Sequence, residues 1–452
     1  MTQCTQTGFQ FERHSSRDVV ARFDGGAMTS DAGALLLRQT DRRINLLDRL
    51  AQCFDDHRKP WLVQHSVREM VAQRVYGLAL GYEDLSDHDQ LREDPLLGVL
   101  SGKRSAGEAA LAGKSTLNRL ELSTGKPDRY KKIHCRQQAI DELLVEVFLE
   151  AHEQAPERIV LDLDVTDLPL HGHQEGRFFH GYYDQYCYLP LYIFAGEHLL
   201  CARLRTADQD AAAGSTQEVE RIVGQIRQRW PAVEIIVRGD SGFCRDELMT
   251  WCEGHGVSYV LGLARNQRLR AQIDRQMREA ARMRSETGRP ARVFKQFYYR
   301  TTTGSWSRSR RVVAKAEQIE GKENPRYVVT NLSPRRWRSQ ALYEEMYCGR
   351  GEMENRIKEQ LSLFATRVSA ETMSANQLRL SFAGCAYVLM EALRRLGLKG
   401  TELARAQATT IRLKLLKIGA QIRITVRKVW LSMATSYPRQ VLFGQAWAQL
   451  RC

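Results

Sequence analysis

The chain has 452 residues, of which 67 are lysine or arginine and 53 are aspartate or glutamate, so its formal net charge is +14. This length is too great for one compact core, and the basic excess favours a polyanionic partner such as nucleic acid. No stretch approaches 18 uncharged apolar residues and no apolar leader opens the chain. The sequence therefore predicts a cytoplasmic protein with no membrane segment. Its ten cysteines lack the paired spacing of a zinc site, as expected of reduced thiols.

The positive charge is concentrated in two segments. Residues 265–315 hold 15 basic and 3 acidic side chains, and residues 366–452 hold 14 and 3. One such segment is readily explained as a solvated surface. Two in a single chain favour nucleic-acid binding.

Residues 1–150 have the pattern of a mainly helical N-terminal domain, which could bind DNA ends. A short strand at 17–24 precedes helices expected at 32–38, 43–53, 60–80, 115–122 and 131–152. Gly113-Lys114-Ser115-Thr116 resembles the end of a phosphate-binding loop, but Glu108 stands where that motif needs a glycine. Ser115 is instead predicted to be a helix N-cap.

From residue 151 to 264 the pattern is that of an α/β catalytic core. We expect a strand at 158–166, a hairpin of 187–194 and 198–204, a helix opened by the capping box Ser215–Glu218, a strand at 233–238, a helix at 245–254 and a strand at 258–263. The order β-β-β-α-β-α-β is that of the ribonuclease-H-like fold, a mixed sheet flanked by helices.

Residues 265–338 interrupt this core with a basic, β-rich insertion. An arginine-rich helix at 265–285 precedes strands at 293–300, 307–316 and 326–330. Trp306 in this insertion is either a surface aromatic or a platform on which an unpaired base stacks. Residues 339–370 then return to the core as a helix, and 371–452 form a basic, helical C-terminal region for DNA binding or dimerisation.

Acids at three places in the chain are candidates for chemistry. Asp162 and Asp164 alternate onto one face of a strand that otherwise looks buried, where a cation such as Mg²⁺ would neutralise them. An edge strand with solvated acids explains them equally well. Asp240 ends a strand expected to lie parallel to the first, although a plain Gly-Asp-Ser-Gly turn is the simpler interpretation.

The third acid lies on a helix. Spacings of three and four place Tyr347, Arg350, Glu354 and Lys358 on one face, which suits binding of a metal and a phosphate together. A helix with exposed ion pairs is the alternative. The histidines His171, His173 and His180 are better explained as solvated or DNA-facing side chains than as ligands of a transition metal.

These residues resemble the DDE transposases of bacterial insertion sequences, most closely the group called the 1380 family within the broader insertion-sequence-4-like superfamily. The resemblance is carried by segments 161–166, 175–183, 237–243 and 347–356. The superfamily patterns Asp-x-Thr, Arg-x-Asp-x-x-aromatic and Tyr-x-x-Arg-x-x-x-Glu match here at Asp164, at Arg238, Asp240 and Phe243, and at Tyr347, Arg350 and Glu354. Leu361 stands where the superfamily has a lysine, and Lys358 is the candidate replacement.

The resemblance implies a transposase that cuts the ends of its element and joins them to target DNA. Asp164, Asp240 and Glu354 would be catalytic and bind two Mg²⁺ ions, with Mn²⁺ as a substitute. The residues implied to contact DNA are Arg238, Tyr347, Arg350, Lys358 and, through a flipped base, Trp306. Asp162 could be a further ligand or only a neighbour.

The implied partner is double-stranded DNA, both the terminal inverted repeats and the target, bound by a homodimer in a synaptic complex at the bacterial nucleoid. Two alternatives remain: a ribonuclease-H-like DNA nuclease that cuts without joining, and an inactive DNA-binding descendant. Short inverted repeats flanking the gene would favour the transposase over both.

Overall fold

The computed structural model describes residues 8–103, 109–122, 131–302 and 304–451. Its contacts divide the chain into two units, one of residues 136–384 and one that combines the chain up to 135 with the chain from 385 onward. The boundaries expected at 150 and 371 differ from this division. The N- and C-terminal segments share one unit because they pack closely: the Ala32 amide donates to the Ile418 carbonyl, and a Cβ on Gly33 would lie 2.1 Å from the Leu415 carbonyl oxygen.

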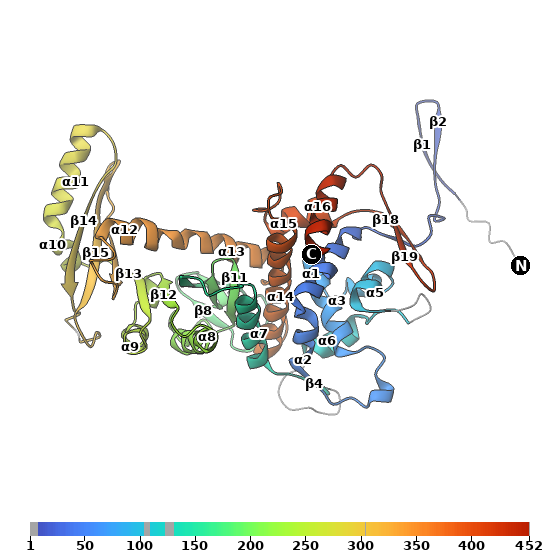
Figure 1. The fold of residues 1–452 in the computed structure, drawn as a ribbon, viewed down its shortest axis with the longest axis horizontal. Helices are drawn as coiled ribbons and strands as arrows, with labels where there is room; N and C mark the ends of the chain where they lie inside the picture. The colour runs from blue at the N-terminus through green and yellow to red at the C-terminus, as the bar shows by residue number, and fades with distance from the viewer. Residues whose placement is uncertain (1–7, 104–108, 123–130, 303, 452) are drawn as a thin grey trace, which may run out of the picture. The chain divides into compact units, whose positions relative to one another are not determined.

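The unit of residues 136–384 is built on one nine-stranded mixed sheet (Figure 1). The strand order is β11-β10-β6-β12-β13-β17-β15-β14, with β16 paired to β15. Strand β12 pairs in parallel with both β6 and β13, and the other pairings are antiparallel. The strands are β6 (Arg158–Val165), β10 (Leu191–Ala195), β11 (His198–Arg203), β12 (Glu234–Gly239), β13 (Ser258–Leu263), β14 (Ala291–Tyr299), β15 (Arg310–Ile319), β16 (Lys322–Glu323) and β17 (Arg326–Thr330).

The strands of the insertion extend this same sheet. Strand β17 pairs with β13, with Val260 opposite Thr330, and β15 and β14 follow outward. The single arginine-rich helix expected at 265–285 is instead two helices, α10 (Gln267–Gln272) and α11 (Asp274–Thr287), which are separated at the buried Ile273.

Helices cover both faces of the sheet, and strand alternation decides which residues face each layer. Leu161 and Leu163 of β6 pack in the core formed with α7 (Gln137–Glu150), α8 (Ser215–Arg229) and α9 (Asp246–Gly254). Val160 and Ile236 face the other way, against Leu342 and Met346. Those two belong to a continuous helical run on the opposite side of the sheet (Figure 1), made of α12 (Ser339–Ala341), the π-helical turn η4 (Leu342–Tyr347), the 3₁₀ turn η5 (Cys348–Arg350) and α13 (Gly351–Ser362).

The strand expected at 187–194 is two strands in two sheets. Strand β9 (Gln185–Tyr188) belongs to a small sheet of order β7-β9-β8, with β7 (Leu168–Pro169) and β8 (Phe178–His180). The chain enters β10 only at Leu191. Pro190 explains the break, because proline has no N–H to donate to a ladder.

The other unit is helical with small sheets. Its helices include α1 (Leu35–Ile44), α2 (Leu46–Gln52), α3 (Val67–Leu80), α4 (His88–Leu91), α5 (Pro95–Ser101), α6 (Lys114–Glu121), α15 (Ala408–Ile411), η6 (Arg412–Leu416) and α16 (Gln440–Arg451), while α14 (Met373–Gly397) has residues in both units. Its strands are β1 (Phe9–His14) with β2 (Arg17–Ala21), β4 (Phe54–Asp56) with β5 (Ile133–Cys135), and β3 (Met28–Thr29), β18 (Ala420–Ile424) and β19 (Val429–Met433) in one sheet. The prediction of a wholly helical C-terminal region is therefore wrong. The alternation of Ile422 and Ile424 with polar residues was the missed strand signal.

Two expected helix caps differ in the structure. Helix α6 begins at Lys114 after Gly113, and its first amide donates to Asp89 Oδ1, so a side chain from another segment replaces the cap expected from Ser115. Helix α8 begins at Ser215 after Gly214. The Ser215 hydroxyl donates to the Ala212 carbonyl and does not cap the helix as the predicted capping box would. Within the described residues, no helix has the length and apolar character needed to span a membrane.

Candidate active site

Two of the candidate carboxylates lie at the same edge of the large sheet. Strands β6 and β12 are parallel neighbours, with Leu163 opposite Gly239. Asp164 is the next residue of β6, and Asp240 directly follows β12. The carboxyl ends of parallel strands meet at one edge, which is where α/β proteins place their sites. The structure thus brings together two acids that are 76 positions apart.

The helical run from α12 to α13 covers these acids. Asp162 and Asp164 share the face of β6 that carries Val160, which packs against this run. Arg350, at the end of η5, places its Nη1 atom 3.2 Å from Asp164 Oδ2. Glu354 follows one helical turn later in α13 and is exposed.

Two further carboxylates act on the charge of Asp164. Burial raises the pKa of Asp164 to about 6; the Arg350 guanidinium opposes this rise, and the negative charges of Asp240 and Glu354 add to it. Asp164 is therefore a half-buried acid whose ionised form is disfavoured by desolvation and, to a smaller extent, by two like charges. Such perturbed carboxyl groups in a polar cluster are typical of functional sites.

The donor chemistry of this cluster fits a hard divalent cation, since carboxylate oxygens are the preferred ligands of Mg²⁺. A cation would also relieve the repulsion that raises the pKa of Asp164. Within the described part of the chain, however, no three acidic, histidine or cysteine side chains lie close enough together to bind a metal as they stand. The Arg350 guanidinium provides the positive charge at Asp164 instead.

Asp162 has a different partner from Asp164. Arg238, opposite it on β12, donates from Nε to Asp162 Oδ1 at 2.5 Å and from Nη2 to Oδ2 at 2.8 Å. Burial raises the pKa of Asp162, and the Arg238 guanidinium opposes that rise. Asp162 is thus one half of a buried ion pair.

Arg238, which is predicted to contact DNA, has other partners in this structure. Besides its two bonds to Asp162, Arg238 donates from Nη1 to the Met346 carbonyl at 2.5 Å, and the residue is buried. Both edges of the guanidinium are thus occupied. Arg238 instead connects β12, β6 and the end of η4.

Two glycines allow this close packing, and the sequence analysis did not single them out. A Cβ on Gly349 would lie 2.6 Å from Arg238 Nη1, and one on Gly262 would lie 2.6 Å from the Tyr347 hydroxyl. The same Cβ on Gly262 would lie 3.1 Å from the carbonyl carbon of Asp240. Tyr347 therefore reaches the end of β12 through a gap that only glycine leaves open. No local sequence signal distinguishes these glycines from those in turns.

The remaining two DNA-contact candidates differ in exposure. Lys358 is exposed, one turn after Glu354 on the same face of α13. Trp306 is only 4% exposed and belongs to the main core, where its ring meets Tyr299 edge-on at 5.7 Å. The stacking role predicted for Trp306 is incompatible with this burial.

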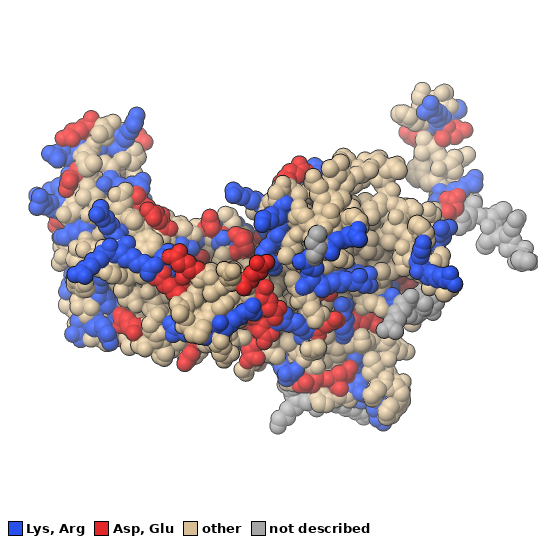
Figure 2. Space-filling model, in the orientation of Figure 1, with Lys and Arg blue, Asp and Glu red and all other residues tan. Residues whose placement is uncertain are grey.

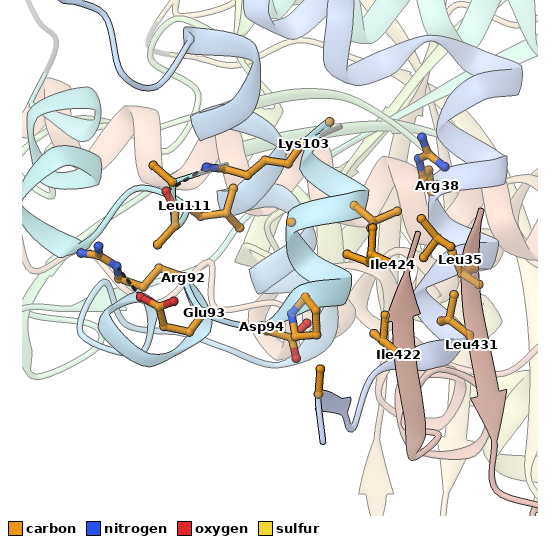
Figure 3. A pocket seen from close by; sticks show the side chains of 18 residues that line it. Leu35, Arg38, Arg92, Glu93, Asp94, Lys103, Leu111, Ile422, Ile424 and Leu431 are labelled. Atoms are coloured by element: carbon orange, nitrogen blue, oxygen red, sulfur yellow. Dashed lines mark hydrogen bonds and ion pairs between the residues drawn. The ribbon is translucent and has the colours of Figure 1, made fainter. Parts of the chain in front are cut away.

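A large cavity in the other unit has a different character (Figure 3). Its volume is about 810 Å³, and hairpin β18–β19 gives it an apolar wall that includes Ile422, Ile424 and Leu431. Two of its cations are already partnered: Arg92 pairs with Glu93, and Lys103 donates to the Ala110 carbonyl. Arg38 is a third cation that lines the cavity.

Comparison with known proteins identifies the family of the chain. The family model described as Transposase DDE domain group 1 matches residues 11–452. The chain belongs to this family. It is accordingly an enzyme of the transposase class.

Among solved structures, the chain is similar to a piggyBac transposase in a synaptic complex with hairpin DNA, determined by cryo-electron microscopy. The two share 10% sequence identity, the match covers 86% of this chain and 80% of the other, and the TM-score is 0.40. Comparison with curated protein sequences gives no match.

Proposed function

We propose that this transposase cuts DNA at the ends of a bacterial insertion sequence of the 1380 family and transfers those ends into target DNA. The observation that carries the proposal is the meeting of Asp164, Asp240 and the Glu354 helix at one sheet edge, where the charges of Asp240 and Glu354 act on Asp164. Acids at one sheet edge beside Arg350 suit a reaction at a phosphodiester, whose charge needs both cations and positioning donors.

The proposed core is ribonuclease-H-like. Its support is the order of elements β6, β10, β11, α8, β12, α9 and β13. Strand β10 runs antiparallel to β6, whereas β12 and β13 run in the same direction as β6. Arrangement alone is an argument by analogy, so the site residues carry the functional claim.

In this proposal Asp164, Asp240 and Glu354 are the catalytic ligands of two Mg²⁺ ions, which Mn²⁺ can replace. Bound there, the ions would supply Lewis-acid activation of the attacking oxygen and stabilise the leaving oxygen. Arg350 exchanges its hydrogen bond to Asp164 for one to a DNA phosphate. Tyr347 and Lys358 orient the phosphate from either side of Arg350 on the same helical run.

The proposed partner is double-stranded DNA, first the terminal inverted repeats and then the target. Exposed arginines crowd the insertion helices α10 and α11, among them Arg268, Arg275, Arg278 and Arg282, and Figure 2 shows basic side chains over this region. Such a surface follows a phosphate backbone without reading sequence. We place the reaction in a homodimer that synapses both ends at the bacterial nucleoid.

The test is cleavage of a duplex that carries the flanking terminal repeat, with Mg²⁺, by wild type and by Asp240→Asn and Glu354→Gln. Both variants should lose nicking at the repeat boundary. Glu352→Gln is the matched control, because Glu352 lies on the same helix, is exposed and pairs only with Arg356 among the contacts described for its side chain.

The outcomes separate the alternatives. Cutting that is unchanged in both variants would refute the acid assignment. Cutting by wild type with no joining to a second DNA would identify a ribonuclease-H-like nuclease. Binding without cutting would identify an inactive DNA-binding descendant.

A further inference from the structure

The small sheet β7-β9-β8 carries an exposed aromatic surface that the catalytic proposal does not use. Phe179 of β8 and Tyr186 of β9 are directly opposite in the antiparallel ladder, and their rings meet edge-on with centroids 5.6 Å apart. Phe179 is 53% exposed and Tyr186 is 42% exposed. Apolar rings on one solvent-facing side of a two-stranded ladder are costly unless something covers them.

An arginine completes this surface. The guanidinium of Arg177 lies over the Tyr186 ring, 3.7 Å from its centroid. The Arg177 Nε atom is buried and has no hydrogen-bond partner, and no ion pair to Arg177 is found among the described residues. A stacked guanidinium without a carboxylate partner suits an anionic or π-rich ligand. We refer to Arg177, Phe179 and Tyr186 together as the aromatic patch.

The patch is held firmly against the rest of its unit. The Glu175 amide donates to the Glu371 carbonyl at 2.8 Å, and Glu175 Oε2 accepts from the Met373 amide at 2.9 Å. Gly176 has a φ of +69°, and a Cβ there would lie 2.7 Å from Thr206 Cγ2. Exposed rings on a fixed support bind a ligand with little loss of side-chain freedom.

The patch also lies beside the proposed active site. Strand β7 starts at Leu168, four residues after Asp164, and pairs with β9, so the small sheet begins directly after the end of β6 in the chain. Tyr183, at the turn between β8 and β9, is close enough that Asp167 and Asp164 add to the burial that raises its pKa to about 12. Tyr182 in the same turn is 85% exposed.

We propose that the aromatic patch binds unpaired nucleotides of the DNA strand next to the reacting phosphate, by stacking bases on Phe179 and Tyr186 and contacting the backbone through Arg177. The proposal rests on the DNA-cutting function proposed above, because it takes its ligand from the strand whose phosphodiester reacts at the acids. Stacking suits this ligand since every base has a π face, which makes the contact independent of sequence.

The experiment is fluorescence anisotropy of the full-length protein with labelled single-stranded poly(dT) and with a duplex of equal length, without added metal. Phe179→Ala with Tyr186→Ala should weaken poly(dT) binding by roughly tenfold or more and leave duplex binding within about twofold. Tyr186→Phe retains the ring and should retain wild-type affinity. Tyr298→Ala is the matched control and should retain wild-type affinity for poly(dT). Tyr298 is 72% exposed and lies on β14, in the same unit but outside the aromatic patch.

The results distinguish this inference from the proposed function. Equal poly(dT) affinity in the double variant and wild type would overturn the proposal that the aromatic patch binds nucleotides. It would leave the proposed DNA-cutting function intact. Wild type that binds neither DNA would overturn both. A changed oligomeric state of the double variant by light scattering, with poly(dT) binding unchanged, would show that the patch contacts a second copy of the chain instead.

Discussion

Asp162 and Asp164 show how two like residues on one strand face acquire opposite roles. Both are largely buried, and both side chains meet an arginine. Arg238 satisfies both oxygens of Asp162, whereas Arg350 approaches Asp164 with one atom at 3.2 Å and two further acids are close. Asp162 and Arg238 consequently form a structural ion pair. The carboxylate of Asp164 is less fully neutralised and therefore favours binding of a cation.

This difference predicts that replacement by asparagine changes the stability of the protein in opposite directions at Asp164 and at Asp162. Asp164→Asn should raise the free energy of unfolding by about 1–3 kcal/mol at pH 7.5 in EDTA, because burial and two like charges hold its pKa near 6. The folded wild type binds this proton more tightly than the unfolded chain, so its stability falls as pH rises from about 4 to about 6. Urea unfolding should therefore show the gain disappearing near pH 4.

Asp162→Asn is the control for that measurement. Burial raises the pKa of Asp162 as well, but the substitution leaves the buried Arg238 charge without its carboxylate. Because this loss outweighs the relief of no longer burying the Asp162 charge, the free energy of unfolding should fall by about 3 kcal/mol at pH 7.5. If both variants shift stability in the same direction, the assignment of different roles to the two acids is wrong.

At the scale of elements, one arginine joins the three segments that carry the acids. Arg238 lies on β12 two residues before Asp240, bonds Asp162 two residues before Asp164 on β6, and bonds the Met346 carbonyl eight residues before Glu354. Its planar fork supplies these three bonds at once, which a lysine ammonium on a flexible stem cannot reproduce. Arg238 is thus a positioning residue.

Arg238→Lys should therefore lower both stability and the affinity of the protein for Mn²⁺, by about 2–4 kcal/mol and about tenfold or more respectively. The matched control is Arg310→Lys. Arg310 is as deeply buried and pairs with Asp246 at 2.5 Å and Glu253 at 2.8 Å, joining β15 to α9 away from the acids. Chemical unfolding and Mn²⁺ titration followed by electron paramagnetic resonance should show a stability loss in both variants and an affinity loss only in Arg238→Lys.

For the whole molecule, the uneven charge determines how DNA affinity should respond to salt. The exposed arginines of α10 and α11 are suited to displace counterions from phosphates. Replacing Arg278 by alanine should reduce the slope of log affinity against log salt by about 1, as measured by anisotropy with a duplex. Arg336→Ala should leave the slope unchanged, since Arg336 is exposed but bound to both oxygens of Glu234. Equal slopes for wild type and Arg278→Ala would remove this helix from the DNA interface.

The sequence by itself determined most of the alternating core from β6 to β13, because period-2 strands and helix spacings are local properties. The resemblance to a family singled out Asp164, Asp240 and Glu354 as candidate acids. Only the tertiary structure decided what these residues touch. The burial of Trp306, the three bonds of Arg238 and the pairing of β17 with β13 depend on segments far apart in the chain. Likewise, the union of the N-terminal segment with the C-terminal segment follows from packing at Gly33, which no local pattern records.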